Sequence, residues 1–161
     1  SDATRMPKGV HLFYLREFYR HNRLAKGEMV IDGERLNLPD IKIPIFMQAG
    51  ETDHIAPHAS VFNSAKLFGG ETTYMLAGSG HIAGVINHPD KKKYHHSINP
   101  ALPDTLEEWK AGAEKRPGSW WPYWIKWLDA ASPGKVKART PGDGALAPIE
   151  DAPGSYVKVK A

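Results

Sequence analysis

The middle of the chain carries two short apolar runs, each of which is followed by a glycine. The first run, IPIFMQA, spans residues 43–49 and ends at Gly50, and the second spans residues 72–76 and closes near Gly78. Nearly continuous apolar runs of this length are typical of strands buried on both faces of a parallel sheet. A helical pattern over residues 57–68, with proline in its first turn, separates them. This order predicts a βαβ unit with a right-handed crossover, whose two following loops lie at the same edge of the sheet.

The N-terminal pattern predicts one long amphipathic helix and a small hairpin. Residues 8–26 carry a wide apolar stripe at helical spacing. Two short runs then flank Asp32-Gly33, a dipeptide that suits the type I′ turn of a β-hairpin. These elements occupy residues 1–42, ahead of the predicted βαβ unit.

The pattern after the βαβ unit predicts two helices joined by irregular segments. Residues 82–101 show no clear period and are expected to form a histidine-rich loop. Thr105 and Glu108 form a capping box for a short helix that extends to Ala113. Ser119 can cap a second helix in which tryptophans recur at helical spacing.

The last thirty residues differ in composition from the rest of the chain. Residues 43–131 contain the predicted strands and helices of a core, and residues 132–161 form a tail rich in proline and glycine. Residues 132–155 are expected to be extended with little structure of their own. The alternation over residues 156–160 suits an edge strand.

Length, charge and cysteine content argue against several classes of protein, among them nucleic-acid-binding and membrane-spanning proteins. The 161 residues are the size of one ordinary domain. The formal charge of +3 is small and scattered, and the run from Lys91 to Lys93 is typical of a solvated loop, so a nucleic-acid partner is not expected. No span approaches the roughly 20 apolar residues of a transmembrane helix. The absence of cysteine excludes disulfides and thiolate metal sites and fits a cytoplasmic protein.

The two glycine-edged loops carry the candidate chemistry. Asp53 lies in AGETDHIAP and His81 lies in LAGSGHIAGVIN, each directly after a predicted parallel strand. The βαβ geometry predicts that they face one another, as the acid and the base of a catalytic triad do in α/β-hydrolase folds. A histidine flanked by glycines suits a general base. No GxSxG elbow precedes them and the chain has no cysteine, so the triad lacks its nucleophile here.

These motifs strongly resemble the polyhydroxyalkanoate synthases, in particular the C-terminal part of the class I catalytic domain. The matching segments are Ser1-Asp2-Ala3-Thr4, AGETDHIAP, GSGHIAGVIN, PGSWWPYW and the ending PGSYVKVKA. The resemblance implies the C-terminal portion of an α/β-hydrolase fold, without the half that carries the nucleophile. It implies that residues 1–42 are the end of a cap region and the re-entry of the chain into the core, and that residues 43–131 are the C-terminal part of the catalytic domain. It also implies an acyltransferase that polymerises (R)-3-hydroxyacyl-CoA into polyester and releases CoA.

The resemblance assigns roles and partners as well. Asp53 matches the catalytic aspartate and His81 the catalytic histidine of a Cys-His-Asp triad, with the aspartate orienting the histidine or acting on the incoming hydroxyl. The cysteine is expected in an upstream half of the same enzyme, and this chain alone is expected to be inactive. The family implies a cytoplasmic homodimer that can meet the surface of polyester granules. No cofactor is implied, because acyl-CoA is the substrate.

Other side chains favour structural roles. His58 stands where the family commonly has tryptophan, which affects the packing near the aspartate loop. His54 adjoins Asp53, and we expect it to point away or to support the loop. Zinc binding by His88, His95 and His96 is not favoured, because their spacing is not typical of zinc sites. Core packing is favoured for the tryptophans over an aromatic surface that meets polymer.

Two other functions fit the same residues. One is an esterase or polyester depolymerase of the same fold, which fold and triad order do not separate from a synthase. The other is a non-catalytic, granule-binding module built on a hydrolase remnant. The upstream sequence discriminates them: a cysteine elbow indicates the synthase, a serine elbow the hydrolase, and neither the binding module.

Overall fold

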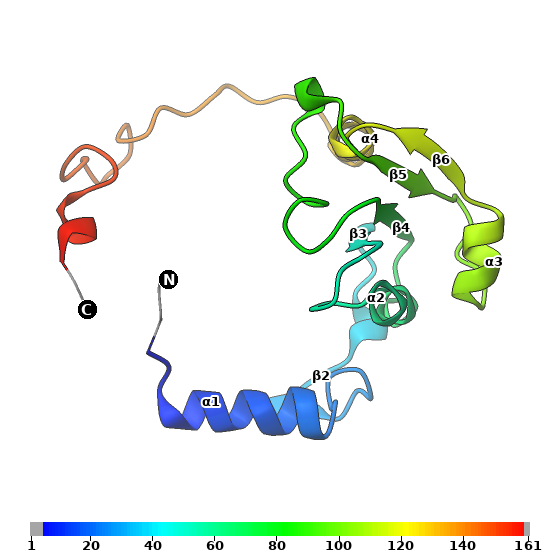
Figure 1. The fold of residues 1–161 in the computed structure, drawn as a ribbon. Coiled ribbons are helices and arrows are strands. Elements are labelled where there is room, and N and C mark those ends of the chain that lie inside the picture. The colour runs from blue at the N-terminus through cyan, green and yellow to red at the C-terminus, as the bar shows by residue number, and fades with distance from the viewer. Residues whose placement is uncertain (1–4, 160–161) are drawn as a thin grey trace. The chain divides into compact units, whose positions relative to one another are not determined.

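The two apolar runs form adjacent parallel strands in the computed structural model, which describes residues 5–159 (Figure 1). Strand β3 (Ile45–Gly50) pairs with β4 (Thr72–Ala77) in parallel, with Ile45 opposite Thr72 and Gly50 opposite Ala77. Helix α2 (His58–Ala65) connects them, with Pro57 at its N-cap. The predicted βαβ unit is therefore confirmed. The match noted at residues 1–4 lies outside the described residues.

Two further strands extend this sheet in the opposite direction. Strand β5 (His95–Ile98) pairs antiparallel with β4, and β6 (Glu114–Pro117) pairs antiparallel with β5. The strand order is β3-β4-β5-β6, so the protein is α/β with a mixed sheet. The prediction of a continuous loop over residues 82–101 was wrong at β5. Its short sequence, HHSI, has no apolar run that would predict a strand. The segment is a strand because it pairs with β4.

The sheet buries a separate apolar cluster on each face. Because side chains alternate along a strand, Tyr74 and Leu76 of β4 face one cluster and Met75 and Ala77 face the other. The first cluster receives side chains from α2 and from α3 (Leu106–Ala111). The second receives Trp120, Trp121 and Tyr123, which lie at and just inside the start of α4 (Trp121–Ala131).

Both C-terminal helix starts follow the expected capping chemistry. Thr105 and Glu108 form the predicted capping box at α3. The Oγ of Ser119 accepts a hydrogen bond of 3.1 Å from the backbone N–H of Trp121 at the start of α4. Packing of the tryptophans is mixed: Trp120 is buried and stacks on Phe46 with ring centroids 6.0 Å apart, whereas Trp124 is 37% exposed.

The N-terminal helix is shorter than the pattern predicts. Helix α1 (Lys8–Tyr14) continues as one π-helical segment, Leu15–Arg20, and then stops. Asn22 has a φ of 50°, a left-handed conformation that cannot continue a right-handed helix. Most apolar side chains of this segment are solvent-exposed in the structure: Val10, Leu12, Phe13, Tyr14, Leu15, Phe18 and Tyr19.

The predicted hairpin is confirmed. Strands β1 (Met29–Ile31) and β2 (Glu34–Leu36) pair antiparallel. Asp32 and Gly33, which join them, both have positive φ, as a type I′ turn requires. A 3₁₀ turn, Leu38–Asp40, follows.

The chain divides into two compact units, one up to Ala131 and one from Ser132 onward. The second unit contains no helix or strand before a 3₁₀ turn, Ser155–Lys158, so an edge strand over residues 156–160 was wrong for the described part of that range. Local bonds favour the turn, because Glu150 Oε1 accepts from both the backbone N–H and the hydroxyl of Ser155. Within residues 5–159 no helix is long and apolar enough to cross a membrane.

Candidate active site

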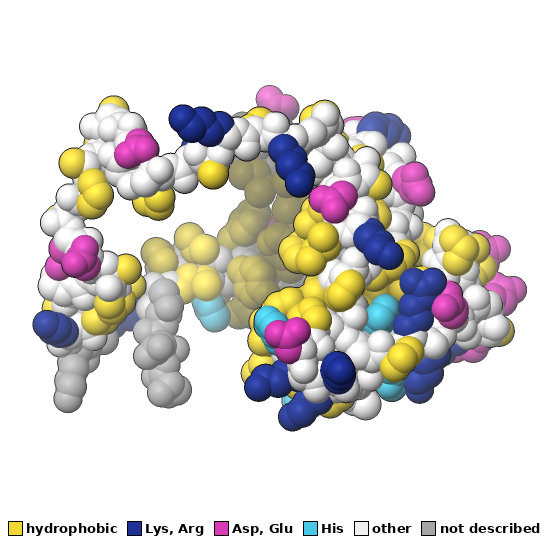
Figure 2. Space-filling view, turned by 90° about the horizontal axis from the view of Figure 1, so that it is seen from above, with side chains coloured by type: hydrophobic (Ala, Val, Ile, Leu, Met, Phe, Trp, Pro, Cys, Tyr) yellow, Lys and Arg dark blue, Asp and Glu magenta, His cyan; other side chains and the backbone are white. Residues whose placement is uncertain are grey.

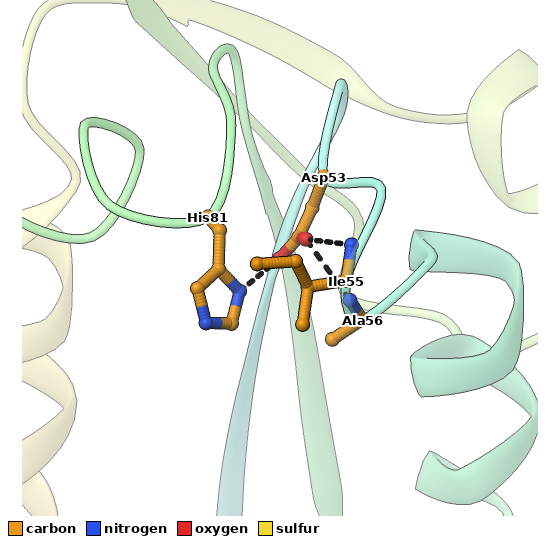
Figure 3. Close-up of polar contacts among 4 residues, drawn as sticks. All are labelled: Asp53, Ile55, Ala56 and His81. Carbon is orange, nitrogen blue, oxygen red and sulfur yellow. Dashed lines mark hydrogen bonds and ion pairs between the residues drawn. The ribbon is translucent and has the colours of Figure 1, made fainter. Parts of the chain in front are cut away.

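The turn after β3 holds Asp53 through both of its carboxylate oxygens (Figure 3). Oδ1 accepts hydrogen bonds of 2.8 Å and 2.9 Å from the backbone N–H groups of Ile55 and Ala56, and Oδ2 lies 2.8 Å from His81 Nδ1. The side chain is 7% exposed. The Ala56 N–H, together with His81 and the Ile55 N–H, lowers the pKa of Asp53 to about 2, although desolvation opposes the shift.

The expected facing pair is therefore present, and its geometry selects one tautomer of the histidine. A carboxylate can only accept, so His81 Nδ1 carries the hydrogen that is shared with Asp53. In the neutral ring, Nε2 then carries the lone pair and can accept a proton. The His81 side chain is 46% exposed, so it is open to a reacting group from outside this chain.

Close backbone packing brings the two loops together. The Thr52 N–H donates to the Ser79 carbonyl at 3.2 Å. A Cβ built on Gly50 would lie 2.7 Å from the same Ser79 carbonyl oxygen. Glycine at position 50 thus lets the acid loop, residues 50–57, contact the base loop, residues 78–87, directly.

Two tryptophans of the PGSWWPYW motif hold the base loop from another side. The indole Nε1–H of Trp120 donates to the Gly84 carbonyl at 2.9 Å, and that of Trp121 donates to the Val85 carbonyl at 2.9 Å. The two motifs GSGHIAGVIN and PGSWWPYW, far apart in sequence, therefore form one structural unit. Both motifs are visible in the sequence, but no local pattern predicts that they contact one another.

A pocket of about 410 Å³ opens beside the pair. Its apolar lining includes Ile82, Val85 and Ile86 of the base loop. Gln48 of β3 also lines it, and within residues 5–159 its Nε2 is buried without a hydrogen-bond partner. The pocket therefore places apolar side chains next to the acid–base pair, as binding sites for small molecules commonly do.

Three of the other histidines, the candidate zinc ligands, each contact a different group. The ring of His88 meets Asp90, His95 meets Glu51, and His96 is buried against the Gly118 carbonyl. Burial lowers the pKa of His96. Among the described residues no three histidine or acidic side chains are grouped to hold a metal ion.

His58 and His54 lie on either side of the turn that leads into α2. His58 begins the helix, and its Nε2 lies 3.1 Å from Lys110 Nζ of α3. Its carbonyl accepts a bond of 3.1 Å from the Tyr74 hydroxyl. Tyr74 and Trp109 meet edge to face at 4.8 Å and fill the core below. His54 is exposed.

One face of the molecule shows mixed charge. On the face drawn in Figure 2, basic and acidic side chains are interspersed. This agrees with the small net charge of +3.

No family model matches the chain. Individual curated proteins do match it. The poly(3-hydroxyalkanoate) polymerase of Methylorubrum extorquens is 51% identical over 162 residues, a match that covers 100% of this chain and 27% of the relative. The poly(3-hydroxyalkanoate) polymerase subunit PhaC of Rhizobium meliloti (strain 1021) is 50% identical, covering 100% and 26%. The PhaC subunit of Cupriavidus necator is 40% identical, covering 100% and 28%.

By sequence, this chain is a relative of the poly(3-hydroxyalkanoate) polymerases. The resemblance inferred from the motifs around Asp53, His81 and the tryptophans is thereby confirmed over the whole chain. The chain spans about a quarter of the length of these polymerases.

Proposed function

We propose that this chain is the C-terminal part of a polyhydroxyalkanoate synthase and supplies the acid and the base of a Cys-His-Asp triad. The observation that carries the proposal is the 2.8 Å contact between Asp53 Oδ2 and His81 Nδ1 on loops that follow adjacent parallel strands. Full-chain identity of about half to polymerases supports the reaction class. The cysteine comes from a part of the enzyme outside these 161 residues.

The proposed reaction follows from the tautomer of His81. Nε2 takes the proton of the cysteine thiol, which has an ordinary pKa near 8.5 and needs this activation at neutral pH. The thiolate attacks the thioester carbonyl of (R)-3-hydroxyacyl-CoA, the bond from the carbonyl carbon to the CoA sulfur breaks, and the CoA thiolate leaves, taking up the proton held by His81 Nε2. The hydroxyl of another hydroxyacyl unit then attacks the acyl-cysteine, His81 accepts the hydroxyl proton, and an ester bond forms as the cysteine thiolate departs.

Asp53 acts in this scheme by orienting His81. Both of its oxygens are already engaged, and a carboxylate with a pKa of about 2 is a weak base toward an alcohol. Its negative charge instead stabilises the imidazolium that forms each time His81 takes a proton. Asp53 is therefore better suited to orienting the histidine than to acting directly on the incoming hydroxyl.

We further propose that the chain completes an α/β-hydrolase fold together with the upstream half of the enzyme. Within the described sheet, β3 pairs only with β4, which leaves a six-residue parallel edge open. Open edges of this kind are normally covered by another strand. The exposed apolar side chains of α1 are a second surface that such a partner would cover.

The remaining partners are part of the same proposal. The substrate is an (R)-3-hydroxyacyl-CoA, with 3-hydroxybutyryl-CoA as the specific proposal, and the product is a polyester. The enzyme acts as a homodimer in the cytoplasm, at the surface of polyester granules. Its chemistry needs no cofactor.

The test uses the full-length enzyme and follows CoA release from (R)-3-hydroxybutyryl-CoA. The 161-residue chain alone should release no CoA, and mixing or co-expression with the upstream half should restore release. The substitution His81→Ala should abolish it. Normal turnover by the His81→Ala enzyme would refute the assignment of the base, and turnover by the chain alone would refute the need for an external nucleophile. Hydrolysis of a preformed polyester without polymerisation would instead indicate a depolymerase.

A further inference from the structure

A second histidine–carboxylate pair links the acid loop to β5. His95 Nε2 lies 3.0 Å from Glu51 Oε2, and Glu51 is two residues before Asp53 in the chain. Because the carboxylate accepts, the ring nitrogen donates. The contact joins two segments that are 44 positions apart.

The same histidine also contacts the start of the base loop. The Gly78 N–H donates to the His95 carbonyl at 2.8 Å. A Cβ built on Gly78 would overlap the His95 ring, so this ring lies directly against the glycine. His95 therefore touches the acid loop with its ring nitrogen and the base loop with both its ring and its backbone.

The exposure of the pair bears on what it does. The side chains of His95 and Glu51 are 27% and 44% exposed, and ion pairs this accessible add little to stability. Small displacements of an acid–base pair, by contrast, have large effects on the rate of a reaction. We therefore expect this contact to matter more for the relative position of the acid and base loops than for the stability of the fold.

We propose that Glu51 and His95 are positioning residues for the site. Their hydrogen bond, with the His95 ring seated on Gly78, sets the spacing of the acid and base loops and thereby holds Asp53 against His81. This inference rests on the proposed function of the Asp53–His81 pair. It adds two residues that do not themselves touch the reacting groups.

The experiment measures kcat and KM for CoA release by the full-length enzyme with Glu51→Ala, His95→Ala and the double substitution. We expect kcat to fall about tenfold with KM within about twofold. The double variant should be no slower than the slower single variant, because both break one contact. Glu51→Gln keeps an acceptor oxygen and should recover most of the activity. His11→Gln is the matched control, since His11 is an exposed histidine of α1 that lies outside both loops.

A second readout separates positioning from a general loss of stability. The pH dependence of alkylation of the nucleophilic cysteine reports how well His81 activates the thiol. In the Glu51→Ala enzyme the half-maximal rate should move to higher pH, and in the His11→Gln enzyme it should stay unchanged. A fall in activity that follows only the loss of folded protein, with an unchanged alkylation profile, would overturn the proposal.

The outcomes also distinguish the two proposals. If His81→Ala abolishes activity while Glu51→Ala and His95→Ala match the unaltered enzyme, the positioning role is wrong and the proposed function stands. If His81→Ala keeps activity, the proposed function itself is wrong. Should His95→Ala fail to fold, the exposed Glu51→Ala variant decides the question by the same two measurements.

Discussion

The parallel and antiparallel halves of the sheet contribute differently to the candidate site. Strands β3 and β4 run in the same direction, so their following loops place Asp53 and His81 at one edge. Strand β5 runs the other way and begins at that edge, where His96 pairs with Ala77 and the His95 ring reaches Gly78. Strand β6 reverses again and ends there at Pro117.

This difference explains how distant motifs meet. The chain leaves β6 at the edge that carries the base loop, and so Trp120 and Trp121 reach the carbonyls of Gly84 and Val85. The parallel half thus carries the reacting groups, and the antiparallel half carries His95, Trp120 and Trp121, which contact the loops of those groups. Substitutions in the two halves should therefore differ in size and in kind.

The largest effect is expected for Asp53→Asn in the parallel half. Asparagine keeps an acceptor for the Ile55 and Ala56 N–H groups but turns its NH₂ toward His81 Nδ1, which selects the wrong tautomer. The kcat for CoA release by the full-length enzyme should fall by about 10³–10⁴. The control is Asp90→Asn, whose carboxylate meets only the exposed His88 ring at 3.7 Å. A loss smaller than about tenfold would contradict the orienting role.

A smaller effect is expected for Gly50→Ala, at the contact between the two loops. The added methyl would lie 2.7 Å from the Ser79 carbonyl oxygen, so the loops must separate. We expect kcat to fall by about 10- to 100-fold. Gly9→Ala in α1 is the matched control, because a Cβ there meets nothing within 4 Å and alanine favours the helix. Equal activities of the two variants would show that the loop contact is unimportant.

The antiparallel half is probed by Trp120→Phe. Phenylalanine keeps an aromatic ring against Phe46 but removes the donor to the Gly84 carbonyl. Leaving this acceptor without its partner should cost about 1–3 kcal/mol in the free energy of unfolding. The activity should fall less than for Gly50→Ala. Thermal unfolding and kcat of the full-length enzyme measure both effects, with the more exposed Trp124→Phe as the control. Activity lost as fully as in Asp53→Asn would contradict the division of roles.

The smallest effect is expected in the pH dependence of stability. The pKa of Asp53 is about 2 in the folded chain and near 3.8 without the fold, so its ionised form stabilises the fold above about pH 4. That contribution is lost as pH falls through about 2. The difference in unfolding temperature between the unaltered enzyme and Asp53→Asn should therefore shrink between about pH 5 and pH 2. A constant difference over this range would argue against an ionised, hydrogen-bonded Asp53.

Sequence reasoning succeeded where the signal is local. The apolar run before Gly50, the Asp32-Gly33 turn and the Thr105 capping box each carry their own structural information within a few residues. From the βαβ order alone, the meeting of Asp53 and His81 could be expected. The motifs also led to the polymerase relatives that the sequence comparisons confirm.

Periodicity missed one strand and one helix end. Strand β6, with the sequence EKRP, is polar and ends in proline, and it is a strand because β5 lies beside it. The long N-terminal helix ends early because Asn22 takes a left-handed conformation. Neither feature follows from periodicity.

The amino-acid sequence therefore specifies which residues carry the candidate chemistry, since the glycine-edged loops, the acid and the histidine are all visible in it. The folded chain adds which residues hold them: Trp120 and Trp121 on one side of the base loop, and Glu51 with His95 on the other. The physical reason is that a strand's direction and register determine which distant loops share an edge. Those quantities depend on pairing between segments, which no single stretch of sequence records.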